Sequence, residues 1–132
     1  MREDTKACTF DVESQYVDLA AEVFSLLSDG TRIRIILALR GGELAVGELA
    51  ERVGKSPTVT SQHLAKLRWG KIVQARQNGN RVFYSLIDEH VRQLVTHAVF
   101  QAEHAVDDTL PEHHLGARGL PVSADGDAGS AS

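Results

Sequence analysis

The sequence predicts a mostly α-helical (α+β) fold with one small β-hairpin, in the order α-α-α-α-β-β-α. Apolar residues recur at helical spacing in four early segments and one late segment. Between them, Asn78-Gly79 separates two β-prone runs, a pattern typical of a tight hairpin. We expect one domain over residues 14–108, flanked by a flexible N-terminal segment (1–13) and a flexible Gly/Ala/Ser-rich tail (109–132).

The elements follow from apolar periodicity and from the residues at their ends. In the fourth helix, Ser56 is a favourable N-cap, Pro57 suits the first helical position, and Gly70 is expected to end the helix. Asp88 can cap the last helix. Helices are therefore predicted over 14–28, 31–40, 46–53 and 57–69, a hairpin over 72–86, and a final helix from Asp88 to about Val106.

The charge is divided along the chain, although the net charge is only −4. Residues 1–30 hold seven acidic and two basic residues, and residues 88–132 hold eight and two. The block between them holds ten basic and three acidic residues, and the stretch from Lys55 to Arg81 contains six bases and no acid. Such a stretch suits a surface that meets phosphates.

Two short helices joined by a tight turn at Gly54 form a helix-turn-helix pattern. The second helix carries short or hydrogen-bonding side chains in its first turns, as a helix that enters the DNA major groove requires. The hairpin after it would be a wing that reaches a neighbouring groove or the backbone. We expect contacts with double-stranded DNA from Ser56, Thr58, Thr60, Ser61, Gln62, His63 and Lys66 on the helix, and from Arg76, Asn80 and Arg81 on the wing.

This region resembles the winged helix-turn-helix core of the ArsR/SmtB family of metal-responsive bacterial repressors. The resemblance covers roughly residues 16–106 and is most specific in "SQHLAKLR", the predicted recognition helix, and "GNRVFYSL", the predicted second strand of the wing. The family implies a homodimer that binds a pseudo-palindromic operator and releases it when an inducer binds.

Many members of this family sense thiophilic ions through cysteines in a pattern like E-L-C-V-C-D-L. The matching stretch here is "ELAVGEL", with Ala45 and Gly47 at the positions of the thiolates. Cys8 is the single cysteine and cannot rebuild that site. Arsenite, lead, cadmium and copper(I) are therefore poor candidates for the inducer, because these soft ions prefer sulfur.

Histidines are concentrated near the end of the chain. His90 and His104 would lie about 21 Å apart on one helix, too far to share a metal ion. They can meet if a second copy of the helix runs antiparallel, which creates two equivalent sites related by a dyad. Position 97 is the midpoint of 90 and 104, so we interpret His97 as a dimer-interface residue.

The pattern is similar to the family's site on its C-terminal helix, D-x-H…H-x-x-(H/E), in the variant of its nickel- and cobalt-sensing members. Gln101 departs from it, since another ligand is usual there. Five nitrogen and oxygen donors, with water or Asp88 as a sixth, suit Ni(II) or Co(II) better than the four-coordinate shell that Zn(II) prefers. The resemblance implies as metal ligands His90, Glu103, His104, His113 and His114, with Asp88 either a ligand or an N-cap.

The function predicted is a metal-responsive repressor that leaves its operator when Ni(II) or Co(II) binds, so that metal-export genes are derepressed. A zinc-responsive repressor and a metal-independent winged-helix regulator remain alternatives. An enzyme is not expected, because the sequence has no H-E-x-x-H, nucleophile elbow or Gly-rich phosphate loop. Metal storage would leave the basic stretch without a role. An acidic N-terminus and the lack of a spanning apolar segment predict a cytoplasmic protein with no membrane partner.

Overall fold

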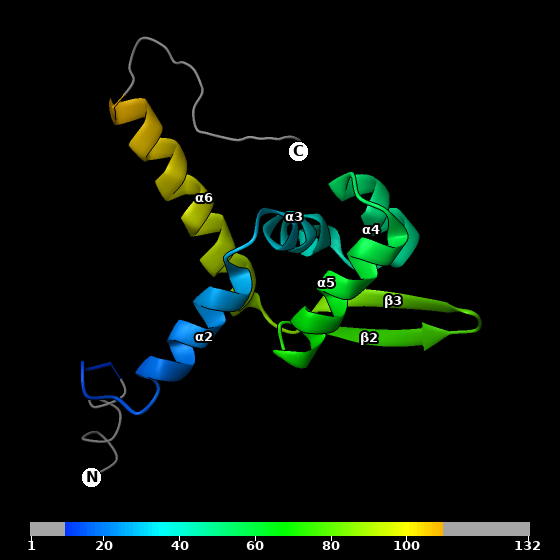
Figure 1. The fold of residues 1–132 in the computed structure, drawn as a ribbon, viewed down its shortest axis with the longest axis horizontal. Helices are drawn as coiled ribbons and strands as arrows, with labels where there is room; N and C mark the ends of the chain where they lie inside the picture. The colour runs from blue at the N-terminus through cyan, green and yellow to red at the C-terminus, as the bar shows by residue number, and fades with distance from the viewer. Residues whose placement is uncertain (1–9, 110–132) are drawn as a thin grey trace.

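A computed structural model describes residues 10–109 of the chain. Residues 1–9 and 110–132, which make up most of the two predicted flexible segments, lie outside this range. The predicted helices and hairpin are all confirmed, with ends that differ by a few residues. The elements are α2 (Val17–Leu27), α3 (Gly30–Ala38), the 3-10 helix η1 (Leu39–Gly41), β1 (Leu44–Ala45), α4 (Val46–Val53), α5 (Pro57–Trp69), β2 (Val73–Asn78), β3 (Arg81–Leu86) and α6 (Glu89–Thr109) (Figure 1).

The strand β1 is an addition to the predicted order. It pairs antiparallel with β3, through Leu44 opposite Tyr84 and Ala45 opposite Phe83, so the sheet has three strands in the order β1-β3-β2. Two residues are too few to show an alternating pattern, and sequence periodicity could not reveal this strand. The strand ties the start of the helix-turn-helix to the wing.

The turn between α4 and α5 is built as predicted. Gly54 has φ 71°, the left-handed conformation that favours glycine, and it ends α4. Ser56 then begins α5 as its N-cap, with Oγ accepting a hydrogen bond of 3.1 Å from the Val59 backbone N–H, and Pro57 follows at the first position.

Gly70 ends α5 as its C-cap, as predicted. Lys71, not Gly70, takes the left-handed conformation, with φ 64°. Gly70 matters because Leu26 of α2 packs directly on its Cα. A Cβ at position 70 would lie 2.2 Å from Leu26 Cδ2. The glycine therefore permits a close approach of two helices.

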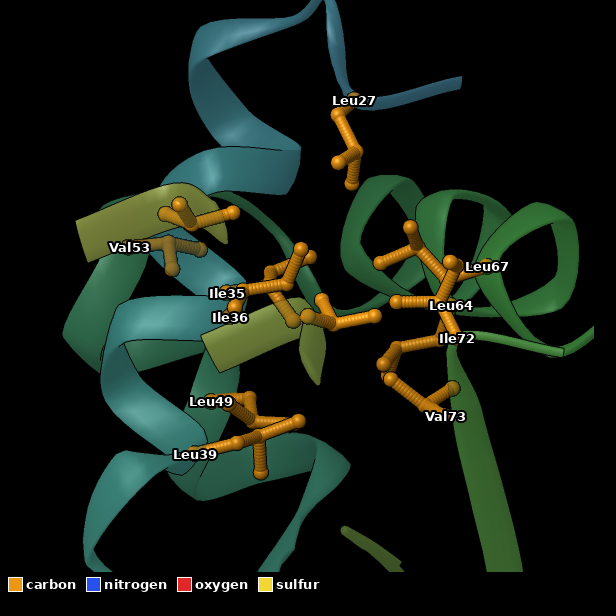
Figure 2. Packing of buried hydrophobic residues seen from close by; sticks show 12 residues of the cluster. Leu27, Ile35, Ile36, Leu39, Leu49, Val53, Leu64, Leu67, Ile72 and Val73 are labelled. Atoms are coloured by element: carbon orange, nitrogen blue, oxygen red, sulfur yellow. The ribbon is translucent and has the colours of Figure 1, made fainter. Parts of the chain in front are cut away.

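The core lies between α3, α4, α5 and the base of the sheet (Figure 2). Ile35 and Ile36 of α3, Leu49 of α4, and Leu64 and Leu67 of α5 are all fully buried. The buried side of α5 is thereby fixed against the rest of the domain. The cluster consists of Leu27, Ile35, Ile36, Leu39, Leu49, Val53, Leu64, Leu67, Ile72, Val73, Val91 and Val95.

Two helices leave the body of the domain on the side away from the hairpin tip (Figure 1). In α6, Val91 and Val95 are buried, whereas residues 97–107 are exposed. Both helices carry exposed apolar side chains, among them Leu19 and Phe24 on α2 and Phe100 on α6, each more than half exposed. No helix within residues 10–109 is long and apolar enough to cross a membrane.

The Leu26–Gly70 contact generates a stability prediction. Gly70→Ala should lower the free energy of unfolding by about 1–3 kcal/mol, because the added methyl group overpacks the α2–α5 contact. Urea denaturation would measure it. In a Leu26→Ala background the same substitution should cost clearly less, since the obstructing methyl is gone. Equal costs in the two backgrounds would contradict this explanation.

Candidate DNA interface and metal ligands

The recognition helix α5 has one buried and one exposed side. Leu64 and Leu67 are 0% exposed. Since a helix turns every 3.6 residues, the opposite side faces solvent. That side carries most of the DNA contacts predicted for this helix. Its exposed polar side chains are Ser56, Thr58, Ser61, Gln62 and Lys66.

Thr60 is a correction to the predicted DNA contacts. Its side chain is 0% exposed, and Oγ1 has no hydrogen-bond partner within residues 10–109. Residues 60, 64 and 67 follow helical spacing, so Thr60 lies on the core side of α5 with Leu64 and Leu67. The small polar residues of the first turns were assigned to DNA together, but helical geometry divides them between two sides.

His63 lies at the edge between these sides and is half-buried. Its Nδ1 accepts a hydrogen bond of 3.1 Å from Nε of Arg32, which is 31 residues earlier on α3. Burial is the main cause that lowers the pKa of His63 below its ordinary value, and the charges of Arg32, Lys66 and Lys55 add to it while Asp29 opposes it. The lowered pKa favours the neutral ring, and Nε2 is the ring nitrogen that does not face Arg32.

The wing closes at Gly79-Asn80, since Asn78 pairs with Arg81 and Gly79 has φ 66°. The Arg81 side chain is held by an aromatic ring, with Cζ 5.0 Å from the Phe83 ring centre. It is an exposed residue at the base of the turn. Asn80 lies beside it in the turn, so two of the three predicted wing contacts occupy the tip.

Arg76 pairs with an acidic side chain that is 33 residues away in the sequence. Its guanidinium forms two hydrogen bonds with the Glu43 carboxylate, of 3.0 and 2.6 Å, and stacks 5.3 Å from the Phe83 ring centre. The hydrogen bond lowers the pKa of Glu43 and raises that of Arg76. Because the Glu43 carboxylate neutralises its charge, Arg76 should attract a DNA phosphate less strongly than Arg81 does.

Asp88 is the N-cap of α6. Its Oδ1 accepts a hydrogen bond of 2.9 Å from the backbone N–H of His90. Of the two interpretations of this residue, the structure thus shows the capping one. Glu89 and Arg92, one turn apart on the same helix, form an exposed ion pair.

His90, Glu103 and His104 are exposed on α6, as a shared site between chains requires. His90 lies in the first turn and the other two lie near the far end. Within residues 10–109 of one chain, no three histidine, cysteine or acidic side chains come together as a metal site. His113 and His114 lie outside the described residues. The ligand set stays a prediction that needs a second copy of α6.

His97 is exposed midway along α6, and its ring meets that of Phe100 edge-on at 6.4 Å. Phe100 is 56% exposed. The two rings form part of an apolar strip on the projecting half of the helix. This placement is compatible with the predicted role of His97 at a dimer seam, which stays a prediction.

The fold and the exposed side of α5 define a winged-helix transcriptional regulator. Residues 29–74 match the model of the bacterial regulatory protein family arsR. The chain is 51% identical over 104 residues to the HTH-type transcriptional regulator KmtR of Mycobacterium tuberculosis. The matched region covers 79% of this chain and 79% of that protein. It is 45% identical over 80 residues to a cadmium resistance transcriptional regulatory protein CadC homolog of Staphylococcus aureus, covering 59% of this chain and 65% of that protein.

Among solved structures, the chain is similar to the homodimeric winged helix-turn-helix DNA-binding domain of a possible ArsR-family transcriptional regulator from Mycobacterium bovis. The TM-score is 0.65 at 29% identity, covering 80% of this chain and 99% of that one. The chain therefore belongs to the ArsR family. It is a DNA-binding transcriptional regulator and not an enzyme, and the resemblance drawn from its sequence is confirmed.

Burial of Thr60 generates a prediction that separates core from interface. Thr60→Val should leave operator affinity unchanged within about twofold and should raise the free energy of unfolding by up to ~1 kcal/mol, because it removes a buried hydroxyl without a protein partner. Fluorescence anisotropy would measure the operator affinity, and urea denaturation would measure the free energy of unfolding. The matched variant Ser61→Ala, at the exposed neighbour, should weaken DNA binding. Equal losses of affinity would return Thr60 to the interface.

Proposed function

We propose that this chain is a dimeric repressor that binds a pseudo-palindromic operator without metal and leaves it when Ni(II) or Co(II) binds between paired α6 helices. Release would derepress genes for metal export. The observation that carries the proposal is the division of the molecule into two parts. A DNA-facing part, formed by α5 and the wing, is joined to the projecting helix α6, on which His90, Glu103 and His104 are exposed.

The DNA-facing part has the chemistry that operator binding needs. Lys66 and the hydrogen-bonding residues of α5 share one exposed side, and Arg81 occupies the wing tip. Lysine and arginine there would displace counterions from phosphates, and the short side chains would reach base edges. The stretch from Lys55 to Arg81 supplies no carboxylate to repel the DNA.

The dimer is supported by apolar surface on the two projecting helices. Leu19 and Phe24 on α2 are 54% and 57% exposed, and Phe100 on α6 is 56% exposed. Contiguous exposed apolar patches mark protein interaction sites. The similar domain from Mycobacterium bovis is homodimeric, and a second copy would cover these side chains here.

The length of α6 supports a metal site that is shared between two chains. Its 21 residues separate His90 from Glu103 and His104 by most of the helix. An antiparallel pair would bring His90 of one chain near Glu103 and His104 of the other, at both ends of the seam. The tail histidines, His113 and His114, would complete a shell of nitrogen and oxygen donors.

The donor atoms of the proposed ligands indicate which metal is the inducer. Five nitrogen and oxygen ligands with no sulfur suit six-coordinate Ni(II) or Co(II), whereas Zn(II) prefers four. The cadmium resistance regulator among the relatives belongs to a system for a metal ion, which supports metal as the class of inducer. Zn(II) is the alternative that the same donors would also hold.

Release requires a small change in the dimer. Recognition helices of a dimer enter major grooves about 34–36 Å apart, so a modest rotation between subunits spoils the match to both half-sites. A metal ion can drive this change only if it binds the rotated form more tightly than the DNA-bound form.

The deciding experiment is an operator mobility shift with Ni(II), Co(II) and Zn(II) titrated separately. Release by nickel and cobalt at lower free concentrations than zinc would support the proposal. Release by zinc first would favour the zinc-responsive repressor, and binding that ignores all three would favour the metal-independent regulator.

The DNA face generates the next prediction. Lys66→Ala and Arg81→Ala should each weaken operator binding and reduce the slope of log affinity against log salt by about one, because each removes one phosphate contact. Arg40→Ala, which removes an exposed charge in η1, is the control and should change neither the affinity nor the slope. Wild-type affinity in both interface variants would refute the assignment of α5 and the wing.

The metal site generates another prediction. His104→Ala should bind operator normally but stay bound when metal is added, because the variant loses the ligand that distinguishes the two forms. Gln101→Ala, one turn earlier on the same exposed helix, should respond like the wild type. If His104→Ala still dissociates at the wild-type metal concentration, the sensing site lies elsewhere.

A further inference from the structure

Arg32 connects three elements through hydrogen bonds. Its Nε donates to His63 Nδ1 on α5 at 3.1 Å, and its Nη1 donates to the backbone oxygen of Leu26 in the last turn of α2 at 3.0 Å. Its backbone N–H is held by Asp29 Oδ1, the N-cap of α3, also at 3.0 Å. The side chain is half-buried, so its direction is set at both ends.

The chemistry of this contact determines where His63 carries its proton. A guanidinium group has donors and no acceptor, so the nitrogen that faces it must be the unprotonated one. A neutral imidazole has one N–H, which is then on Nε2. The shift of the His63 pKa below its ordinary value favours this neutral form.

The outer edge of the imidazole belongs to the DNA-facing surface. His63 lines an open hollow of about 400 Å³ together with Arg32, Gln62 and Lys66. Gln62 and Lys66 are exposed residues of the proposed DNA interface. A proton on Nε2 is therefore offered at the same surface as their polar groups.

We propose that Arg32 is a positioning residue for operator recognition: it holds His63 in the Nε2–H tautomer, so that the recognition helix presents a hydrogen-bond donor at this position. A donor selects acceptors, which are phosphate oxygens, purine N7, guanine O6 and thymine O4, and it rejects the amino group of cytosine. This inference rests on the DNA interface proposed above. It assigns to Arg32 of α3, which is not among the predicted DNA contacts, the control of which hydrogen-bonding groups His63 can recognise.

The same contact joins α2 to the recognition helix at a second point. Leu26 packs on Gly70 at the end of α5. Arg32 links the Leu26 carbonyl to His63, which lies seven residues before Gly70. These two points on α5 are about 10 Å apart along its axis. A shift of α2, which carries exposed apolar surface, would therefore move the donor that orients His63.

Nitrogen-15 NMR of the imidazoles in the full-length, DNA-free protein tests the tautomer directly, with His63→Gln to assign the signals. At pH 7 the wild type should show His63 protonated on Nε2. Arg32→Met should give a mixture of both tautomers, whereas Arg34→Met, an exposed arginine on the same helix, should not. A wild-type ring protonated on Nδ1 overturns the proposal, even if Arg32→Met does not fold.

Operator binding forms the second arm. Arg32→Met should lose affinity on the order of tenfold, the worth of one oriented hydrogen bond. In a His63→Ala background it should cost nothing further, because its effect passes through the imidazole. Additive losses would overturn the positioning role. If the wild type binds no operator with or without metal, the proposed function fails, and the NMR arm still decides the tautomer.

Discussion

Burial of one side of α5 is the constraint on which the rest of the structure depends. Leu64 and Leu67 pack in the core with Ile35 of α3 and Val73 of β2, and all four are almost completely buried. Because these positions set the rotation of α5 about its axis, they also determine which side chains reach outward. The wing starts at the same core through Val73, so helix and hairpin present their polar residues from one rigid base.

Local chemistry made most of the fold predictable. The N-cap at Ser56 and the left-handed turn at Gly54 depend on residues within one helical turn, and the structure has both as expected. The unforeseen features arose where distant parts meet. Gly70 ends α5 as predicted, but its close contact with Leu26 of α2 has no local signal in the sequence. Thr60 was assigned to DNA because its type fits, although the rotation of α5 buries it.

The candidate site was predictable to a smaller extent, because its important contacts join residues far apart in sequence. Glu43 neutralises Arg76 across 33 residues, and Arg32 reaches His63 across 31. No spacing rule signals such pairs. The metal ligands on α6 stay a prediction, because a site shared between chains would take its geometry from the dimer, to which one chain supplies only half.

The position of the proposed metal ligands also limits how their signal can travel. Glu103 and His104 lie on the exposed part of α6, beyond Val95, the last side chain of that helix in the core. Metal bound there would act on exposed side chains and not directly on the core that holds α5. In the proposed dimer, the coupling would pass through the seam between helices of two chains and enter the domain where the end of α2 and the first turns of α6 reach the core. At α2 it meets Leu26, whose side chain and carbonyl contact Gly70 and Arg32. The recognition helix is thus connected to α2, a helix of the proposed dimer seam, by packing at its end and by a hydrogen bond at its middle.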